Sequence, residues 1–258
     1  SNVINLLAKN KKNILTEKPA FLNINDFNRN LEIIKKNKIF FMESMMYLHH
    51  PQFNKILEII NNNEIGKIYK LEYNLGFDIR KKILGFKRKI KFSSRLTDKK
   101  LGGGAINDIG CYPISFSNKL ANISKKNYIQ KMESQGKIGL TGVDEFAKAT
   151  ITYQNNSFVS DISVSINKKQ NGLAIITGTN GKLLVPNLIT PNNNYFLVVN
   201  GKEYNFFGND LYTYIIEDTQ NYISEGICEA NKKGLNWEEM KLNCEIIDLW
   251  KSQIYKYN

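Results

Sequence analysis

Hydrophobic positions in the N-terminal part of the chain alternate between helical spacing and short continuous runs. Residues 3–7 and 26–36 place apolar side chains three or four positions apart, which is typical of helices that pack on one side. Residues 13–16 and 39–42 form short apolar runs of the kind found in buried strands. The order helix, strand, helix, strand predicts the closing half of a doubly wound α/β sheet.

The spacing of apolar residues changes to two after Gly66. Tyr69, Leu71, Tyr73 and Leu75 alternate with polar residues, as expected for one face of a strand. Similar patterns predict further strands at residues 146–153, 158–166, 172–178 and 182–186, a turn at residues 155–156, a hairpin at residues 200–201, and helices at residues 53–60, 211–227 and 237–254. We therefore expect a large, mainly antiparallel sheet covered by helices.

A glycine-rich loop runs directly into an apolar helical pattern in the middle of the chain. Gly102, Gly103 and Gly104 allow a tight turn, and the pattern that follows predicts a helix. Asp108 and Tyr112 are four residues apart, so on a regular helix they share one face. A carboxylate and a phenol would then lie on one surface.

A lysine lies at the predicted end of the first strand, in the segment Thr16-Glu17-Lys18-Pro19. Proline favours an extended conformation for the residue before it, so Lys18 should lie at the carboxyl end of the strand. Open α/β sheets bind their ligands at that edge. A plain strand exit is the alternative for this segment taken alone.

These segments together resemble the glucose-fructose oxidoreductase, inositol dehydrogenase and MocA family. The resemblance rests on the Glu17-Lys18-Pro19 segment, the three glycines and the pair Asp108 and Tyr112, and Tyr112 places the chain with the tyrosine branch. It implies that residues 1–42 are the second half of a Rossmann-type dinucleotide-binding domain and that residues 43–258 form an α+β domain for substrate binding and oligomerisation. The Gly-x-Gly-x-x-Gly turn of such domains is absent, because no glycine precedes Gly66.

The resemblance also implies an activity: hydride transfer between NAD or NADP and a secondary alcohol of a sugar, cyclitol or diol. The expected catalytic residues are Lys18, Asp108 and Tyr112. The expected cofactor contacts are Glu17, Lys18, Pro19 and Met46, and the expected substrate contacts are Arg95, His50, Asp108 and Tyr112. Leu48 stands where the family usually has arginine, and a structural, hydrogen-bonded role is the alternative for His50.

The chemistry of alcohol oxidation gives each of the three catalytic residues a role. The cofactor carries the hydride, so the protein must supply a proton donor or acceptor and the geometry. Tyr112 is the expected acid or base, and a nearby Lys18 ammonium would lower its pKa. Asp108 would orient the substrate or the lysine through charge-assisted hydrogen bonds.

Composition narrows the classes of partner. A net charge of +12 raises the question of nucleic acid, but lysine and asparagine are abundant throughout and no nucleic-acid motif occurs, so we expect none. The basic segment at residues 80–91 is either a solvated arm or a surface that faces an acidic substrate. With 3 widely spaced cysteines and 2 adjacent histidines, neither a disulfide framework nor a metal site is expected. No apolar run is long enough for a membrane span, and a cytoplasmic protein is expected.

The chain as given begins after the region where the glycine-rich turn would lie, so we expect an N-terminally truncated family member that acts on small sugar-like molecules. The alternative is a cofactor-free sugar-binding or scaffold subunit derived from the same family. The family's second-domain sheet commonly forms a subunit interface, which implies a homodimer or tetramer.

Overall fold

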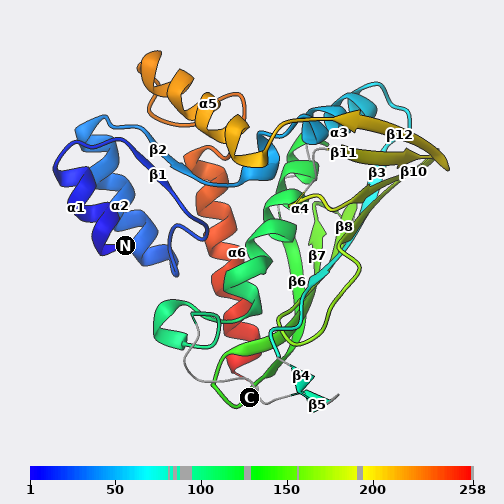
Figure 1. Ribbon diagram of the computed structural model, residues 1–258, viewed down its shortest axis with the longest axis horizontal. Helices are drawn as coiled ribbons and strands as arrows, with labels where there is room; N and C mark the ends of the chain where they lie inside the picture. The colour runs from blue at the N-terminus through cyan, green and yellow to red at the C-terminus, as the bar shows by residue number, and fades with distance from the viewer. Residues whose placement is uncertain are drawn as a thin grey trace.

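A computed structural model describes residues 1–80, 82–83, 86–87, 95–124, 129–155, 157–190 and 194–256. Figure 1 shows a small N-terminal unit beside a much larger sheet, with helices between them. Most of the predicted basic segment, at residues 81, 84–85 and 88–91, lies outside the described residues, as does Asn156 of the predicted turn.

The N-terminal unit has the predicted order of helix, strand, helix and strand. It consists of α1 (Asn2–Lys9), β1 (Ile14–Thr16), α2 (Ile24–Asn37) and β2 (Phe41–Glu43). The two strands are parallel, and Ile14 lies opposite Phe41. Because α1 packs on α2, its buried residues are Ile4 and Ala8, whereas Val3 and Leu6 are exposed. The helix was predicted correctly, but its apolar spacing indicated the wrong buried face.

A short connection leads from β2 into the large sheet. It contains a 3₁₀ turn, η1 (Met46–Leu48), and helix α3 (Pro51–Asn61). His50 caps α3, since its ring nitrogen Nδ1 accepts the backbone N–H of Gln52 at 3.1 Å. The connection is buried along most of its length and joins both parts of the molecule to one hydrophobic core.

The large sheet has eight strands in the order β12-β11-β10-β9-β3-β8-β7-β6. All neighbouring pairs are antiparallel except β3 and β8, which are parallel. The strands are β3 (Ile68–Gly76), β6 (Ile129–Ile138), β7 (Asp144–Tyr153), β8 (Phe158–Ser165), β9 (Leu173–Gly178), β10 (Gly181–Pro186), β11 (Asn194–Val199) and β12 (Lys202–Phe207). The predicted fold class is confirmed: a Rossmann-type unit joined to a large, mainly antiparallel sheet with helices.

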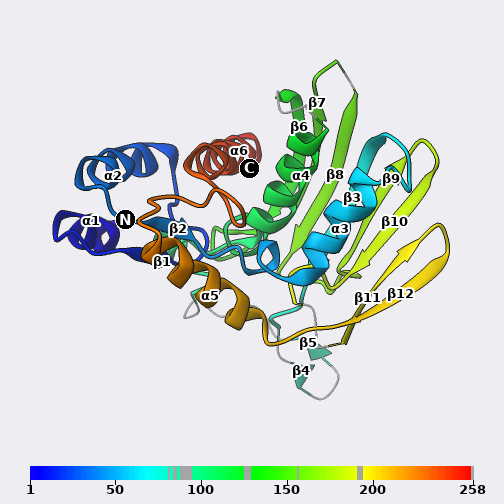
Figure 2. The same ribbon diagram turned by 90° about the horizontal axis from the view of Figure 1, so that it is seen from above.

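Helices cover one face of this sheet in the described part of the chain. Figure 2 shows α3, α4 (Cys111–Ile123) and α6 (Trp237–Tyr255) on the same side, with α5 (Leu211–Ser224) beyond the end of the sheet. The inward side chains of β7 and β8 are fully buried beneath these helices, as the alternation predicted. No helix among the described residues covers the opposite face.

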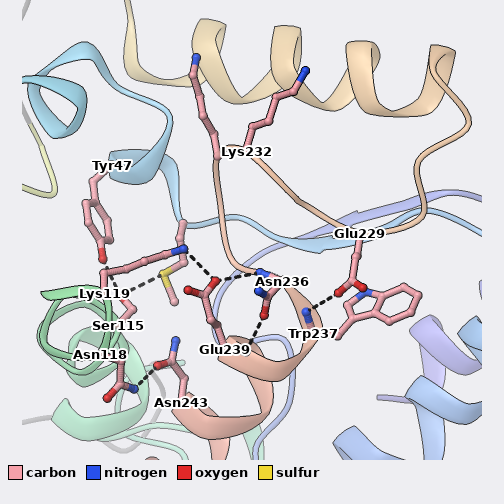
Figure 3. A network of polar contacts seen from close by, with 12 residues as sticks. Tyr47, Ser115, Asn118, Lys119, Glu229, Lys232, Asn236, Trp237, Glu239 and Asn243 are labelled. Atoms are coloured by element: carbon pink, nitrogen blue, oxygen red, sulfur yellow. Dashed lines mark hydrogen bonds and ion pairs between the residues drawn. The ribbon is translucent and has the colours of Figure 1, made fainter. Parts of the chain in front are cut away.

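Polar contacts join α4 to α6 within this helical layer (Figure 3). Asn118 donates to Asn243 at 2.7 Å, and the Lys119 ammonium pairs with Glu239 at 2.7 Å. Glu239 also completes a capping box with Asn236 at the start of α6. This anchoring matters for the site, because the far end of α6 contacts the glycine-rich loop.

Two strands differ from the prediction for identifiable reasons. β6 was not predicted, because it is an edge strand in which Met132 alone is fully buried, so its sequence shows no clear alternation. In β3, a register shift between Ile68 and Lys70 turns Tyr69 outward, while Leu71 and Tyr73 stay buried.

Two features are absent from the described residues. None of their helices combines the length and hydropathy needed to cross a membrane. They also contain no group of three or more histidine, cysteine or acidic side chains that could hold a metal ion.

Candidate active site

Lys18 lies at the carboxyl edge of the two parallel strands β1 and β2. It follows β1 by two residues, and β2 continues alongside, where Ser44 donates its backbone N–H to the Thr16 carbonyl at 2.8 Å. Its side chain is mostly buried, with 12% of its surface exposed. The strand exit therefore directs an ammonium group toward the centre of the molecule.

The glycine-rich loop is closed by backbone hydrogen bonds and by a buried carboxylate. Gly104, at φ +112°, presses against the Asp144 carboxylate so closely that a Cβ at this position would overlap Oδ1. Asp144 Oδ2 accepts the backbone N–H of Ile106 at 2.7 Å, and Oδ1 accepts the Tyr255 hydroxyl at 3.1 Å. A carboxylate thus satisfies a backbone donor at the start of the helix that carries the predicted residues.

That helix does not begin as a regular α-helix. Residues Ile106–Gly110 form a π-helical turn, and α4 continues from Cys111. Pro113 has no backbone N–H, so the regular bond to the Ile109 carbonyl cannot form at this point. Such wide turns occur often at functional sites. Asp108 lies in this turn, and Tyr112 lies in the first turn of α4.

Lys18, Asp108 and Tyr112 lie together. The Lys18 ammonium donates to the Asp108 backbone carbonyl and lies 3.5 Å from Asp108 Oδ1. It also lies 4.9 Å from the centre of the Tyr112 ring. A guanidinium nitrogen of Arg95, whose side chain is 69% exposed, lies 3.3 Å from the same Oδ1. The turn after β1, the turn before the glycine-rich loop and the start of the helix thus bring two cations, a carboxylate and a phenol to one place.

The pKa of Tyr112 is raised, contrary to the sequence-based expectation. Burial is the largest cause, and the thiol of Cys111 and the carboxyls of Glu17 and Asp108 add to it. The Lys18 ammonium, which lies over the ring and is paired with Asp108, does not offset the effect of burial. The phenol therefore keeps its proton at neutral pH.

A pocket of ≈ 320 Å³ opens beside Lys18 and Asp108. Glu17, Lys18 and Pro19 line one side, and Arg95, Asn107 and Asp108 line another. The apolar side chains of Leu22 and Leu101 complete part of its wall. Charged groups of both signs therefore surround a space at the sheet edge where ligands of open α/β sheets bind.

Three predicted contact residues do not line this pocket: Tyr112, whose ring lies next to the Lys18 ammonium, and Met46 and His50, which pack elsewhere. Met46 is buried in η1 among Phe40, Met42 and other residues of a second apolar cluster, and it does not line this pocket. His50 caps α3, and its ring contacts Tyr195 and Tyr214 by their edges. Burial lowers the pKa of His50 to about 4, so it is neutral at pH 7. The structural role, which was the alternative for His50, fits this position.

The sequence interpretation missed two groups near the site. Glu43, at the end of β2, is buried near Lys18, and its place after an apolar run at a strand end was a usable signal. Tyr212, in the first turn of α5, acts electrostatically on Tyr112. No local pattern indicates Tyr212, because it is brought to the site only by the position of α5.

The family comparison covers about half of the chain. Residues 53–184 match the model of the GFO/IDH/MocA C-terminal domain. This segment includes β3, the glycine-rich loop, α4 and most of the large sheet.

Similar proteins with curated names are dihydrodiol dehydrogenases. The trans-1,2-dihydrobenzene-1,2-diol dehydrogenase of Xenopus tropicalis is 28% identical over 206 residues, which cover 80% of this chain and 57% of that protein. The enzyme of the same name from Danio rerio is 26% identical over 264 residues, which cover 97% of this chain and 73% of the relative. The chain thus spans little more than half the length of the Xenopus protein.

Solved structures share the fold at low sequence identity. A 3-ketoreductase from Actinomadura kijaniata superposes with a TM-score of 0.82 at 16% identity, over 98% of this chain and 74% of that one. An aldose-aldose oxidoreductase from Caulobacter crescentus gives a TM-score of 0.82 at 11% identity, over 100% of this chain and 74% of that one. With the match over residues 53–184, these findings show that the chain belongs to the GFO/IDH/MocA family.

Proposed function

We propose that this chain forms the substrate side of an oxidoreductase that transfers a hydride between NAD or NADP and a secondary alcohol of a sugar, cyclitol or diol. The observation that carries the proposal is the Lys18 ammonium, held between the Asp108 carboxylate and the Tyr112 ring at the carboxyl edge of β1 and β2. Alcohol oxidation and its reversal need such proton-handling groups beside the reacting oxygen. The names of the curated relatives and of the similar structures support the same class of reaction.

Tyr112 is the proposed proton donor in the direction of carbonyl reduction. Because its pKa is raised by burial, the phenol is protonated at neutral pH and can donate to the oxygen that becomes the alcohol. The Lys18 ammonium, 4.9 Å from the ring centre, then stabilises the tyrosinate that remains. Asp108 holds Lys18 in place through its carboxylate and its backbone carbonyl.

The residues around the pocket fit the nicotinamide end of a dinucleotide, which supplies the hydride when bound. Glu17, Lys18 and Pro19 form the turn after β1 and would hold this end, since they line the pocket at the ligand-binding edge of the strands. Met46 is not part of this proposal because it lies in another cluster. The related 3-ketoreductase was crystallised with NADP, and the choice between NAD and NADP stays open for this chain.

The pocket chemistry favours a small molecule with several hydroxyl groups. A hydroxyl both donates and accepts hydrogen bonds, and the pocket offers donors on Lys18 and Arg95 and acceptors on Glu17 and Asp108. Arg95 is the proposed substrate contact with the most freedom to move, since most of its side chain is exposed. Tyr212 adds an aromatic side chain near Tyr112.

The open face of the large sheet is the proposed contact with a second copy of the chain. On this face Ile175, Leu184 and Val198 are cross-strand neighbours and only partly buried, so they form an apolar row. A polar hollow of ≈ 860 Å³, lined by residues including Glu72 and Asp161, adjoins them. Light scattering should give a dimer or tetramer, and Leu184→Lys should shift it toward the monomer. A monomeric wild-type chain would contradict this contact.

The function is tested by measuring cofactor binding and turnover separately. The chain is titrated with NADH and NADPH by following nicotinamide fluorescence, and reduction of NAD and NADP is then followed with trans-1,2-dihydrobenzene-1,2-diol, D-glucose and myo-inositol. Saturable binding together with alcohol-dependent reduction supports the proposal. Binding of D-glucose or myo-inositol without either cofactor supports the alternative of a cofactor-free sugar-binding subunit. A folded chain that binds none of these molecules contradicts both.

A further inference from the structure

Glu43 is a buried carboxyl directly behind the turn that carries Lys18. It is the last residue of β2 and lies opposite Thr16 of β1 in the parallel register. Only 5% of its surface is exposed. Lys18 follows Thr16 by two residues, so the carboxyl and the ammonium lie near each other at the same sheet edge.

A hydrogen bond connects Glu43 to the Lys18 turn. Its Oε1 accepts the backbone N–H of Ala20 at 2.9 Å. Pro19 and Ala20 line the candidate pocket and also line a small enclosed cavity that contains Glu43. The turn therefore separates the two spaces, and Glu43 bonds its backbone from the side of the small cavity.

The charges that face Glu43 come from three elements. The Lys18 ammonium acts on it from the turn after β1, and the thiols of Cys111 on α4 and Cys244 on α6 lie close enough to interact with it. Burial raises the pKa of Glu43 to about 7, and the Ala20 hydrogen bond and Lys18 oppose that rise. The carboxyl is thus partly ionised at neutral pH.

We propose that Glu43 is a positioning residue for Lys18, because its buried carboxyl fixes the turn that carries Lys18 through the backbone N–H of Ala20. The importance of this role for catalysis rests on the proposed function, because Lys18 is the proposed catalytic lysine. The positioning itself needs neither cofactor nor substrate. It can therefore be measured on the chain alone.

Two variants separate the hydrogen bond from the charge. Glu43→Gln keeps an oxygen that can accept from Ala20 and removes the ionisable group, whereas Glu43→Met fills a similar volume and removes both. The probe is acetic anhydride, and the acetylated fraction of Lys18 is measured by mass spectrometry relative to exposed Lys38 in the same sample. Circular dichroism checks that each variant is folded.

The expected result depends on whether an acceptor for Ala20 remains. At about pH 8, Glu43→Met should raise the acetylation of Lys18 about threefold, because the turn is released and Lys18 loses its fixed place beside Asp108. Glu43→Gln keeps the acceptor, so acetylation of Lys18 should stay close to the wild-type value. This rescue by glutamine separates the Ala20 bond from packing volume, which the methionine variant preserves.

Two outcomes would overturn the proposal. Wild-type levels of Lys18 acetylation in Glu43→Met would remove the positioning through Ala20, and so would a rise in Glu43→Gln as large as that in Glu43→Met. If Glu43→Met does not fold, hydrogen exchange of the Ala20 amide in the wild-type chain decides, because rapid exchange would show that Glu43 does not hold the turn. A chain that shows the expected acetylation but binds neither NADH nor NADPH would support Glu43 and contradict the proposed function.

Discussion

The candidate active site has two halves: the turn that carries Lys18, and the helix that carries Asp108 and Tyr112. A buried carboxyl holds each half in a comparable way. Glu43 accepts the backbone N–H of Ala20, two residues after Lys18, at 2.9 Å. Asp144 accepts the backbone N–H of Ile106, two residues before Asp108, at 2.7 Å. In each half a carboxylate from a neighbouring strand thus fixes the backbone next to a residue that faces the pocket.

The two carboxyls differ in what else surrounds them. Asp144 also accepts the Tyr255 hydroxyl and packs against Gly104, so its half is fixed by several independent contacts. Glu43 has the Ala20 bond. Burial raises the pKa of Asp144 to about 6 and that of Glu43 to about 7. The helix that carries Asp108 is thus held by several contacts of Asp144, whereas the turn that carries Lys18 is held by a carboxyl whose charge changes closer to pH 7.

The largest expected effect is a loss of stability in Gly104→Ala, which changes the half of the site that Asp144 holds. Gly104 has φ +112°, and an added Cβ would overlap the Asp144 carboxylate, so we expect a loss of about 3 kcal/mol in the free energy of unfolding. Gly142→Ala is the matched control, because Gly142 has φ +79° and open space around its Cβ position, and should lose about 1 kcal/mol. Urea unfolding measures both. Equal losses would mean that Asp144 can move away, and that its half is not rigid.

The second expected effect is a difference between the two carboxyls in the pH range over which each changes the free energy of unfolding. Each has a higher pKa in the folded chain than its ordinary value of 4.5 for Glu43 and 3.8 for Asp144, so folding favours their protonated forms. The stability that this preference contributes is present at low pH and is lost as pH rises to about 6 for Asp144 and about 7 for Glu43. Each contribution amounts to about 3 kcal/mol at most.

Amide variants, which remove the ionisable group of each carboxyl, should separate these contributions. Glu43→Gln should flatten the fall in unfolding free energy up to about pH 7, and Asp144→Asn should flatten it only up to about pH 6. Urea unfolding of both variants and wild type at several pH values measures this. If both variants flatten the same pH range, the proposed difference between the two halves is wrong.

The third expected effect is a loss of turnover when Tyr112 is replaced. Tyr112 lies where the two halves meet, because its ring contacts the Lys18 ammonium. Tyr112→Phe keeps the ring beneath Lys18 and removes the proposed proton donor, so turnover should fall about 100-fold or more. Tyr47→Phe is the control, because Tyr47 is a buried neighbour of Tyr112 whose hydroxyl is already bonded to Ser115 at 2.8 Å. Steady-state kinetics with the best alcohol of the panel measures both. Unchanged turnover in Tyr112→Phe would remove the phenol from the mechanism.

Periodicity predicted the parts of the fold whose burial is one-sided. The inward residues of β7 and β8 are buried at every second position, so their strands were visible in the sequence. β6 was missed because the edge position leaves it mostly exposed, and the buried face of α1 was misjudged because α2 decides which side it packs on. Tertiary neighbours, which local spacing does not record, account for these differences.

The same limit applies to the site. Motif spacing and the resemblance indicated Lys18, Asp108 and Tyr112, which do lie together, because each is close in sequence to the turn or helix that positions it. Glu43 and Asp144 act through backbone groups far away in sequence, so no motif reveals their partners. The raised pKa of Tyr112 was also not predictable, because it depends on burial and on where the lysine lies over the ring.

The smallest expected effect tests whether Asp144 is fixed from α6. Tyr255→Phe removes the hydroxyl that bonds the Asp144 carboxylate and should cost about 1 kcal/mol of unfolding free energy. Because that bond lowers the pKa of Asp144, its loss should extend the fall in stability to a higher pH. Asn236→Ala removes the cap at the other end of α6 (Figure 3) and should also cost about 1 kcal/mol, but without moving the pH range. If both variants leave the pH range unchanged, the Tyr255 bond contributes only to packing, and Asp144 is held by the glycine loop alone.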